Sequence, residues 1–396
     1  MRLGFRAWLV GTTWSTFFDS VTFFALGWAA ASFGADAAGL VLTLGSIPLC
    51  LFVLVGGAVA DRFGVRRTMI ACDAAMALVM TLFVVHAATG VTVTGLCLLS
   101  VASGTAAALR RPAEGVFPRL FAADDELARV MATVSAAQQA ARLGGPPLGG
   151  LLLAMGGLVL TAGLDAVSFV LVLAVLWAVR PPRESAAPGD GAEPMVQAVR
   201  AALRAARRVP GVVPMLLVVS ALAASALPAV MLCIPLAGRS HDWSAGETGL
   251  VAGSWIAGSL VVTGLVSWRG PLGARARVVG PLVGVGGVAA LAAATSASMG
   301  MLGGCVLGAG TAIWTTTALP VFVRLTPPDM LARFQSLLHL AQTAAVMVAL
   351  PVLGLVADSW GLTAAWVVVG VVLVGTAAPR LAVVADDRTL TSVGGT

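Results

Sequence analysis

The stretch "GGAVADRFGVRR", residues 56–67, decides the fold of this chain because it concentrates charge in a strongly apolar sequence. It holds four charged side chains in twelve residues, whereas Asp, Glu, Lys and Arg make up only 11% of the 396 residues. Long apolar runs precede and follow it. A charged turn between two apolar runs is typical of a short loop at a membrane surface. The stretch therefore indicates a membrane protein with a helix on either side of this turn.

Composition supports this interpretation along the whole chain. Hydrophobic residues make up 59% of it, the mean hydropathy is +0.97, and no polar segment is long enough to form a separate soluble domain. We therefore expect an all-α integral membrane protein. A helix needs about 20 apolar residues to cross a hydrocarbon core about 30 Å thick. Twelve candidate spans lie at 7–33, 38–60, 68–88, 91–110, 130–155, 158–179, 213–237, 246–268, 277–297, 300–323, 334–357 and 361–379.

The basic residues predict how these spans are oriented. The chain contains no lysine, and threading it through twelve spans places every arginine on one side, except Arg142 within a span and Arg239 on the opposite side. By the positive-inside rule, that side is the cytoplasm and both termini lie there. The net charge of +6 follows from this topology and from anionic lipid headgroups, so we expect a lipid bilayer and no nucleic acid as partner. Usage rich in Ala, Gly, Val and Arg, without Lys or Tyr, suggests a GC-rich bacterial genome, and for this membrane protein we expect the bacterial inner membrane.

A polar linker divides the spans into two sets of six. Residues 180–212 begin with "RPPRESAAPGDGAEP" and continue into a segment with helical periodicity. We expect a cytoplasmic linker that ends in a basic amphipathic helix on the membrane surface. The predicted domains are a six-helix bundle at 1–179, this linker, and a second bundle with a short tail at 213–396.

The two halves also repeat each other in sequence. A shift of 204 residues superposes identical residues over a window without gaps, and this is difficult to ascribe to shared hydrophobicity alone. Duplication of a six-helix unit is the simplest explanation, as in many secondary transporters. The matching pairs are Asp125 and Asp329, 127–129 and 331–333, Gln138 and Gln342, Pro147 and Pro351, Gly150 and Gly354, and Gly157 and Gly361.

The opening stretch follows the pattern GxxxDRxGxRR, formed by Gly57, Asp61, Arg62, Gly64, Arg66 and Arg67. This pattern resembles the signature loop of the major facilitator superfamily. The resemblance implies two six-helix pseudo-repeats and transport by alternating access.

The loop pattern also has a physical interpretation. Glycines let helices approach closely, and Asp61 at a helix end can pair with arginine and with the positive end of a neighbouring helix dipole. We expect these residues, together with Asp73, to latch the cytoplasmic side shut. A plain topology signal would explain the arginines but neither the glycines nor Asp61.

A second motif lies in the fifth candidate span. The stretch "GPPLGG", with Gly145, Pro146, Gly149 and Gly150, resembles the end of the antiporter motif of drug exporters. Close helix packing with a local kink is a sufficient alternative explanation. This motif, together with "RPAEGVFPRLFAADDELARV" and "LDAVSF", resembles sequences of one branch of the major facilitator superfamily. That branch contains the enterobactin exporter and macrolide and multidrug efflux proteins. The fourth span lacks the mid-membrane arginine of another drug-exporter motif.

Few ionisable residues fall within the candidate spans, and such residues are functional candidates because an aspartate at a helix centre costs about 2.5–3.5 kcal/mol. Asp19 and Arg142 lie near the middle of the first and fifth spans. They fit either a proton site with its counter-charge beside a central cavity or a buried pair that fixes helix packing. Asp165 is predicted to be structural, and His339 to be a satisfied interior group.

A candidate substrate cavity follows from tryptophans and threonines deep in the spans. Its predicted members are Trp14, Trp255, Thr311, Trp314 and Thr315. Such a surface suits an amphipathic organic substrate, but lipid-facing or packing tryptophans explain the pattern equally well. Gln138 and Gln342 are secondary polar candidates.

These observations favour a proton-coupled exporter of small amphipathic, drug-like molecules, an antiporter associated with multidrug resistance. A dedicated exporter of a siderophore or another self-made metabolite is the first alternative, and a transport-inactive membrane sensor is the second. We expect no enzyme, because no nucleophile, base and orienting group occur together. The absence of lysine excludes a P-loop, and the five cysteines lack metal-ligand spacing. The expected protein is a monomer without cofactors that uses the proton gradient.

The arginine distribution generates a topology prediction. Reporter fusions after Arg67, within 185–195 and at the C-terminus should all report a cytoplasmic location, because arginines flank each site on the same side of the threading. Activity of an exported reporter at any of the three sites would contradict it.

Overall fold

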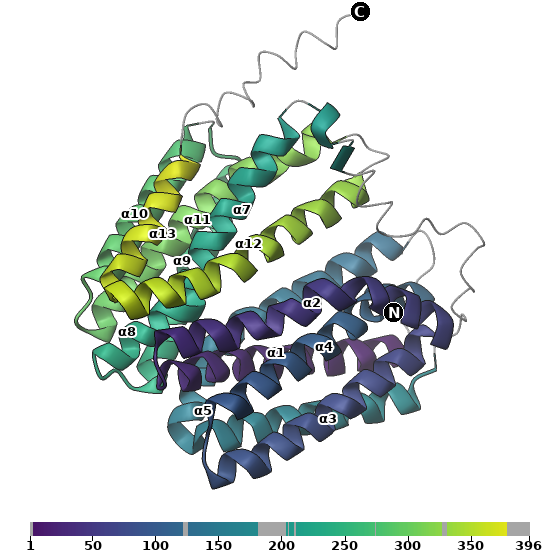
Figure 1. The fold of residues 1–396 in the computed structure, drawn as a ribbon. Helices are drawn as coiled ribbons and strands as arrows, with labels where there is room; N and C mark the ends of the chain where they lie inside the picture. Colours follow the sequence, from purple (N-terminus) through teal and green to yellow (C-terminus); the bar gives the residue numbers. More distant parts are fainter. Residues whose placement is uncertain are drawn as a thin grey trace, which may run out of the picture. The chain divides into compact units, whose positions relative to one another are not determined.

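The computed structural model of the protein describes residues 3–121, 126–180, 203–204, 206–209, 211–273, 275–326 and 331–377. Nearly all of these residues are helical, and no strand occurs among them (Figure 1). The all-helical fold class is therefore confirmed. The chain falls into two compact units, Met1–Ala192 with Gly238–Leu250, and Glu193–Ala237 with Val251–Thr396.

Unit 1 contains the first five labelled helices. α1 packs mainly against α5, α2 against α4, and α3 against α4 and α5. A short 3-10 helix, Phe117–Leu120, continues α4. The helices are α1 Leu3–Ala31, α2 Ala35–Phe63, α3 Val65–Thr89, α4 Val93–Val116 and α5 Leu127–Ala178.

Unit 2 contains the remaining helices, of which α10 packs against α11 and α13, and α7 against α12. A π-helical turn, Ala229–Cys233, joins α7 to α8. The helices are α7 Val212–Pro228, α8 Ile234–Ser240, α9 Ala245–Arg269, α10 Ala276–Ala292, α11 Ala297–Leu325, α12 Leu331–Trp360 and α13 Leu362–Thr376. The first residues of α9 and the last of α8 belong to unit 1.

Two related glycines separate consecutive spans in the two units. The backbone of α5 leaves helical geometry at Gly156 and Gly157, where Gly157 has φ +63°. Gly361, between α12 and α13, has φ +84°. A positive φ favours glycine because other residues place their Cβ against the backbone there. Gly157 and Gly361 are partners in the sequence repeat, so the repeat extends to backbone geometry, and the predicted boundary between 155 and 158 agrees with the break.

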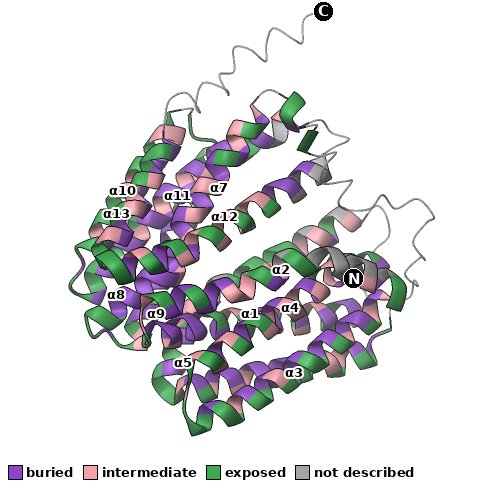
Figure 2. Ribbon diagram, viewed as in Figure 1, coloured by how far each residue is buried: buried purple, intermediate pink, exposed green. Residues whose placement is uncertain are grey.

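The described helices are compatible with a bilayer. Seven of them are long and apolar enough to cross a membrane, and Ala35–Leu49, Ala276–Ala292 and Leu362–Thr376 form shorter apolar helices. Exposed positions alternate with buried ones along the helices (Figure 2). Large apolar side chains occupy many exposed positions, including Val10, Leu82, Leu98, Val261 and Leu302. Such exposed apolar area fits a surface that faces lipid.

One segment packs differently from the predicted domain division. Gly238–Leu250 was expected in the second bundle but belongs to unit 1. The Arg239 guanidinium lies 3.9 Å from the centroid of the Trp28 ring and donates a hydrogen bond to the Trp28 carbonyl at 3.1 Å. Gly249 lies against the backbone of Gly150 on α5, where a side chain would clash. Small residues therefore allow this close approach. The predicted linker, 180–212, lies largely outside the described residues.

Small residues also bring the spanning helices within unit 1 together. A Cβ at Gly104 on α4 would collide with the backbone carbonyl of Gly45 on α2. At the same contact, the Ser100 hydroxyl donates to the Val41 carbonyl at 2.5 Å. Helices approach this closely only where one of them lacks a side chain. The contact therefore depends on glycine at 104.

Gly104→Ala should destabilise the protein by about 1–3 kcal/mol, because the added methyl group forces α2 and α4 apart. Gly163→Ala on α5 is the matched control, since open space surrounds that position. The control should be neutral or gain up to about 1 kcal/mol from helix propensity. Thermal unfolding in detergent checks both variants, and equal melting temperatures would contradict the prediction.

Candidate functional site

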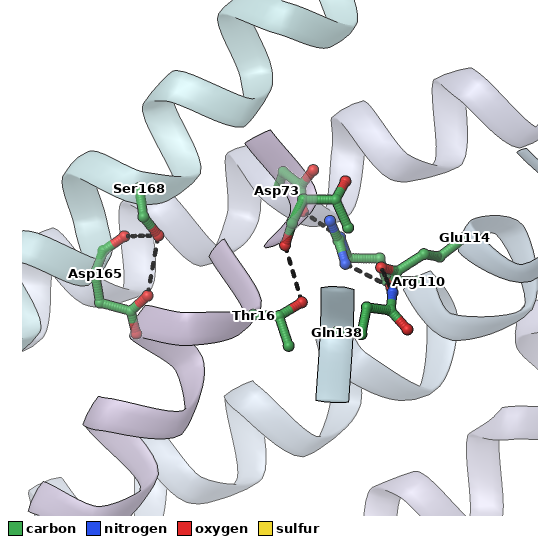
Figure 3. A network of polar contacts seen from close by, with 8 residues as sticks. Thr16, Asp73, Arg110, Glu114, Gln138, Asp165 and Ser168 are labelled. Atoms are coloured by element: carbon green, nitrogen blue, oxygen red, sulfur yellow. Dashed lines mark hydrogen bonds and ion pairs between the residues drawn. The ribbon is translucent and has the colours of Figure 1, made fainter. Parts of the chain in front are cut away.

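A network of charged and polar groups lies inside unit 1 and links three helices. Arg110 on α4 donates from Nε to Asp73 Oδ1 on α3 at 2.6 Å. Its Nη1 donates to Glu114 Oε2, one turn further along α4, at 2.7 Å. Gln138 on α5 donates to the other oxygen of Glu114 at 2.7 Å. Figure 3 shows this network, in which one guanidinium serves two carboxylates.

The burial of this network makes its charges interdependent. Asp73 is 0% exposed and Arg110 is 7% exposed. A buried charge is tolerated only where opposite charges and hydrogen bonds replace its hydration. Asp73 Oδ2 and Arg110 Nη2 have no hydrogen-bond partner and are buried. The network therefore retains one free acceptor and one free donor group.

Asp19 lies near this network without joining it. Its side chain is exposed, and Arg110 is the cation that acts on it most strongly, followed by Arg111. Asp73 and Glu114 act on Asp19 with the opposite sign. Among the described residues, no ion pair within 4 Å includes Asp19. The site thus combines an accessible carboxyl with a buried guanidinium that is already shared by two others.

The predicted pairing of Asp19 with Arg142 is not formed in the described structure. Arg142 is exposed, and the charge near it is Arg111. Its backbone carbonyl accepts a hydrogen bond from the Ser20 hydroxyl at 3.0 Å, which joins α1 to α5. Arg110, and not Arg142, is therefore the cation that acts most strongly on Asp19.

Asp73 does not pair with the arginines of the loop motif, which were its predicted partners. Arg66 donates to the carbonyls of Leu176, Trp177 and Val179 at 2.8–3.2 Å and so caps the end of α5. A cation there also complements the helix dipole. Asp73 lies seven residues from Arg66, about 10 Å along α3, and pairs with Arg110 instead.

The rest of the loop motif is only partly described. Gly64, with φ +89°, forms the turn between α2 and α3. Arg62 and Arg67 are exposed, and the Arg62 guanidinium lies 5.5 Å from the Phe63 ring centroid. The side chain of Asp61 and the surroundings of Gly57 lie outside the described part, so the latch stays a prediction.

The glycines of "GPPLGG" lie at close contacts of α5 within unit 1. A Cβ at Gly145 would collide with Ser20, one at Gly149 would lie 3.1 Å from the Val21 carbonyl, and one at Gly150 would collide with the start of α9. Pro146 lies inside the same helix. These contacts support the packing explanation of the motif, and a role in exchange stays a prediction.

Asp165 lies on the second part of α5, fully buried. The Ser168 hydroxyl donates to its backbone carbonyl at 2.8 Å and to its Oδ1 at 3.2 Å. Its Oδ2 has no partner. Asp19 acts on Asp165 electrostatically across the interface of α1 and α5. Two carboxyls that sequence analysis treated separately therefore influence each other.

The predicted cavity residues are divided between the units. Trp14 is half-exposed on α1 of unit 1. In unit 2, the Trp255 indole donates to the Thr311 hydroxyl at 3.2 Å, whereas Trp314 is buried and Thr315 bonds to its own helix at Ala312.

The two remaining polar candidates also lie in unit 2. Gln342 is partly buried on α12. His339 is exposed on the same helix, so its prediction as an interior group was wrong.

Arg110 and Glu114 are the site residues that sequence analysis missed as functional candidates. The apolar run predicted for the fourth span ends at 110, so Arg110 was assigned to a cytoplasmic loop. The helix continues to Val116. A signal was present, since Arg110 and Glu114 have the i, i+4 spacing at which helical ion pairs form.

Comparison with known families identifies the chain. A family model described as Major Facilitator Superfamily matches residues 8–297. The chain belongs to the major facilitator superfamily. Among curated proteins, a search found none that matches this superfamily member in sequence.

Solved structures of transporters share its fold. A bacterial homologue of the human lysosomal transporter Spinster, inward-facing and occupied, is 14% identical, with a TM-score of 0.73 and 97% of each chain covered. A bacterial homologue of the iron transporter ferroportin, inward-facing, is 19% identical, with a TM-score of 0.71 over 96% of this chain and 100% of that chain. The nucleoside transporter NupG is 12% identical, with a TM-score of 0.70 over 97% and 99%. At these identities the likeness shows the fold alone.

Arg110→Met should cost about 3–5 kcal/mol of stability, because it leaves the Asp73 and Glu114 carboxylates buried without their cation. Arg142→Met is the matched control, since that guanidinium is exposed. Denaturant or thermal unfolding in detergent measures both. If the two methionine variants lose the same stability, the network does not depend on Arg110 as described.

Proposed function

We propose that this major facilitator is a proton-coupled exporter of small amphipathic organic molecules, working by alternating access. The observation that carries the proposal is the accessible Asp19 carboxyl in electrostatic range of the Asp73, Arg110 and Glu114 network. Intramembrane carboxyls are costly and usually functional. A carboxyl that solvent reaches, beside fixed buried charges, is suited to gain and lose a proton during a cycle.

The charge balance of the network supports this assignment. The Asp73 and Glu114 carboxyls share Arg110, and Arg111 is the second cation that acts on Asp19. A deprotonated Asp19 adds a third carboxylate to these two cations. Because like charges at short range oppose each other, protonation of Asp19 relieves this repulsion. The protonated and deprotonated protein therefore favour different arrangements of α1, which is the requirement for coupling.

The aromatic surface of α1 supports an amphipathic substrate. Trp14 is half-exposed and contacts Phe18 edge-on at 5.2 Å between ring centroids. Phe17 packs on Phe18 at the same distance. Aromatic side chains bind the apolar part of a ligand, and a few polar groups orient it.

The proposed direction of transport, export, rests on the resemblance of "ARLGGPPLGG" and "LDAVSF" to efflux proteins. We further propose a monomer in the bacterial inner membrane with cytoplasmic termini and no cofactor.

Asp19→Asn should abolish transport of ethidium against its gradient in reconstituted vesicles with an imposed pH gradient. Exchange of ethidium without a gradient should persist, because the amide keeps the size and polarity of the side chain but carries no exchangeable acid proton. Dye fluorescence and internal pH are recorded together.

Asp36→Asn is the matched control, since Asp36 is an exposed carboxylate on α2 away from the network. It should transport like the unaltered protein. Accumulation by Asp19→Asn at the unaltered level would show that another group couples the proton. Absence of any transport by the unaltered protein, across dyes, macrolides and catechol siderophores, would favour the membrane sensor.

A further inference from the structure

A polar stripe runs along one buried face of α1. Its members recur at intervals of three and four residues, so they lie above one another on the helix. Thr12, Ser15 and Thr22 are buried, and Asp19 lies between them. A membrane-spanning helix normally buries apolar residues on such a face. The stripe consists of Trp8, Thr12, Ser15, Asp19 and Thr22.

The polar atoms of this stripe lack protein partners. The Trp8 indole nitrogen and the hydroxyls of Thr12, Ser15 and Thr22 are buried and make no hydrogen bond to the protein. Elsewhere in unit 1, Asp73 Oδ2 on α3, Arg110 Nη2 on α4 and Asp165 Oδ2 on α5 also lack partners. Buried polar groups are nearly always satisfied, and water satisfies those that the protein does not. So many unpartnered groups in one unit indicate a hydrated path.

The second unit shows that the fold does not require these polar groups. At the repeat shift of 204 residues, all five stripe positions are apolar and buried on α7. Asp165 corresponds to Val369, which is buried on α13. At these five positions, a helix in the same repeat position thus packs with aliphatic side chains, although it buries Ser225 elsewhere. The counterparts of the stripe are Val212, Leu216, Val219, Ala223 and Ala226.

Asp165 is the titratable group that the proposed mechanism has not used. The Thr22 hydroxyl on α1 lies close enough to act on the Asp165 carboxyl as a donor, although the two groups do not meet at hydrogen-bond distance and angle. The charge acting on Asp165 is Asp19 on α1, and the charges acting on Asp19 are Arg110 and Arg111 with Asp73 and Glu114. Two carboxyls with unpartnered hydroxyls near them form a place where protons can be held and passed.

The stripe ends in an apolar core at one end of unit 1. Trp8 packs there with Met69, Phe117, Val172 and Leu176. This is the end of α5 that Arg66 caps, which the arginine distribution assigns to the cytoplasm. Apolar packing excludes water, so the core closes the hydrated path at that end. The Thr22 end is therefore the side from which protons enter.

We propose that Asp165 is a second proton-binding carboxyl of the transporter, joined to Asp19 by water that Thr22 holds. This rests on the proposed role of Asp19 as the coupling group. In the step itself, the O–H bond of protonated Asp165 breaks and its proton passes through water to the Asp19 carboxylate. An O–H bond forms there, Asp165 becomes a carboxylate, and water on the Thr22 side restores its proton. No electrons are transferred.

The first test compares Asp165→Asn with Asp165→Glu in reconstituted vesicles. Asp165→Asn should slow ethidium transport driven by a pH gradient by about a hundredfold, while exchange without a gradient persists. Asp165→Glu should restore most of the rate with a shifted pH profile, because it keeps an acid proton. Ser168→Ala removes the hydrogen bond to Asp165 but not the carboxyl, and should transport nearly normally.

A direct measurement of the proton separates this inference from the proposed function. The infrared band of a protonated carboxyl should respond to pH in the unaltered protein and in Asp19→Asn, and one component should be absent in Asp165→Asn. Thr22→Val should slow proton uptake several-fold. Its control Thr43→Val should not, since the Thr43 hydroxyl is bonded within its own helix at 2.6 Å.

The outcomes are distinct. If Asp19→Asn abolishes coupling while Asp165→Asn transports normally or loses only thermal stability, Asp165 is structural and the inference fails alone. If Asp19→Asn transports normally while Asp165→Asn does not, Asp165 is the coupling group and the function proposed for Asp19 fails. If a sodium gradient at constant pH drives transport, the stripe is a cation site and the proton path is overturned.

Discussion

The guanidinium of Arg110 is the group on which the arrangement of unit 1 depends. A permanent charge buried among helices must be matched by carboxylates, and the helices must deliver them at hydrogen-bond distance. Asp73 from α3, Glu114 from α4 and, through Glu114, Gln138 from α5 meet this requirement. Three helices are therefore tied at one point. The carboxyl of Asp19, on a fourth helix, is acted on by the charges of this anchor.

The placement of Asp19 also depends on the neighbouring contact of α1 with α5. Gly145 leaves room for Ser20, whose hydroxyl bonds to the Arg142 carbonyl. Successive residues of a helix are rotated by about 100°, so anchoring Ser20 against α5 turns Asp19 away from that contact. Gly145 of the packing motif on α5 thus helps to determine the direction in which Asp19 projects from α1.

Much of the fold was predictable because it follows from periodicity and charge. The apolar runs predicted the helices, including the division of α5 at Gly157, and the repeat predicted the matching glycine at Gly361. The loop motif predicted the family, which the family match confirmed. The partners of single charges were not predictable. Arg110 was placed in a loop because its hydropathy ends the apolar run, although its helix continues past it. The i, i+4 spacing of Arg110 and Glu114 indicates one partner in the sequence, but the pairing with Asp73 on another helix shows only in three dimensions.

The pairing of Asp19 with Arg142 failed for a related reason. The depth of a residue along a span can be estimated from sequence. Asp19 and Arg142 both lie near the middle of their spans, but the sequence does not show whether α1 and α5 turn these two side chains toward each other. Asp165 was predicted to be structural because it lies in the stretch "LDAVSF", and its unpartnered Oδ2 shows only in the structure. The unpartnered groups of α1 are spread over fifteen residues, and only the three-dimensional packing shows that protein atoms leave them unsatisfied.

The apolar counterparts of the α1 stripe on α7 bear on how the molecule evolved. If one six-helix unit was duplicated, an ancestor made of two identical copies carried either two such stripes or none. Buried carboxyls destabilise a bundle and hinder its insertion each time they occur. Fusion of the copies into one chain removed that constraint, since each could then change independently. The asymmetry between Asp165 and Val369 is thus a property that a symmetric dimer could not have possessed, and it arose after the two units became one gene.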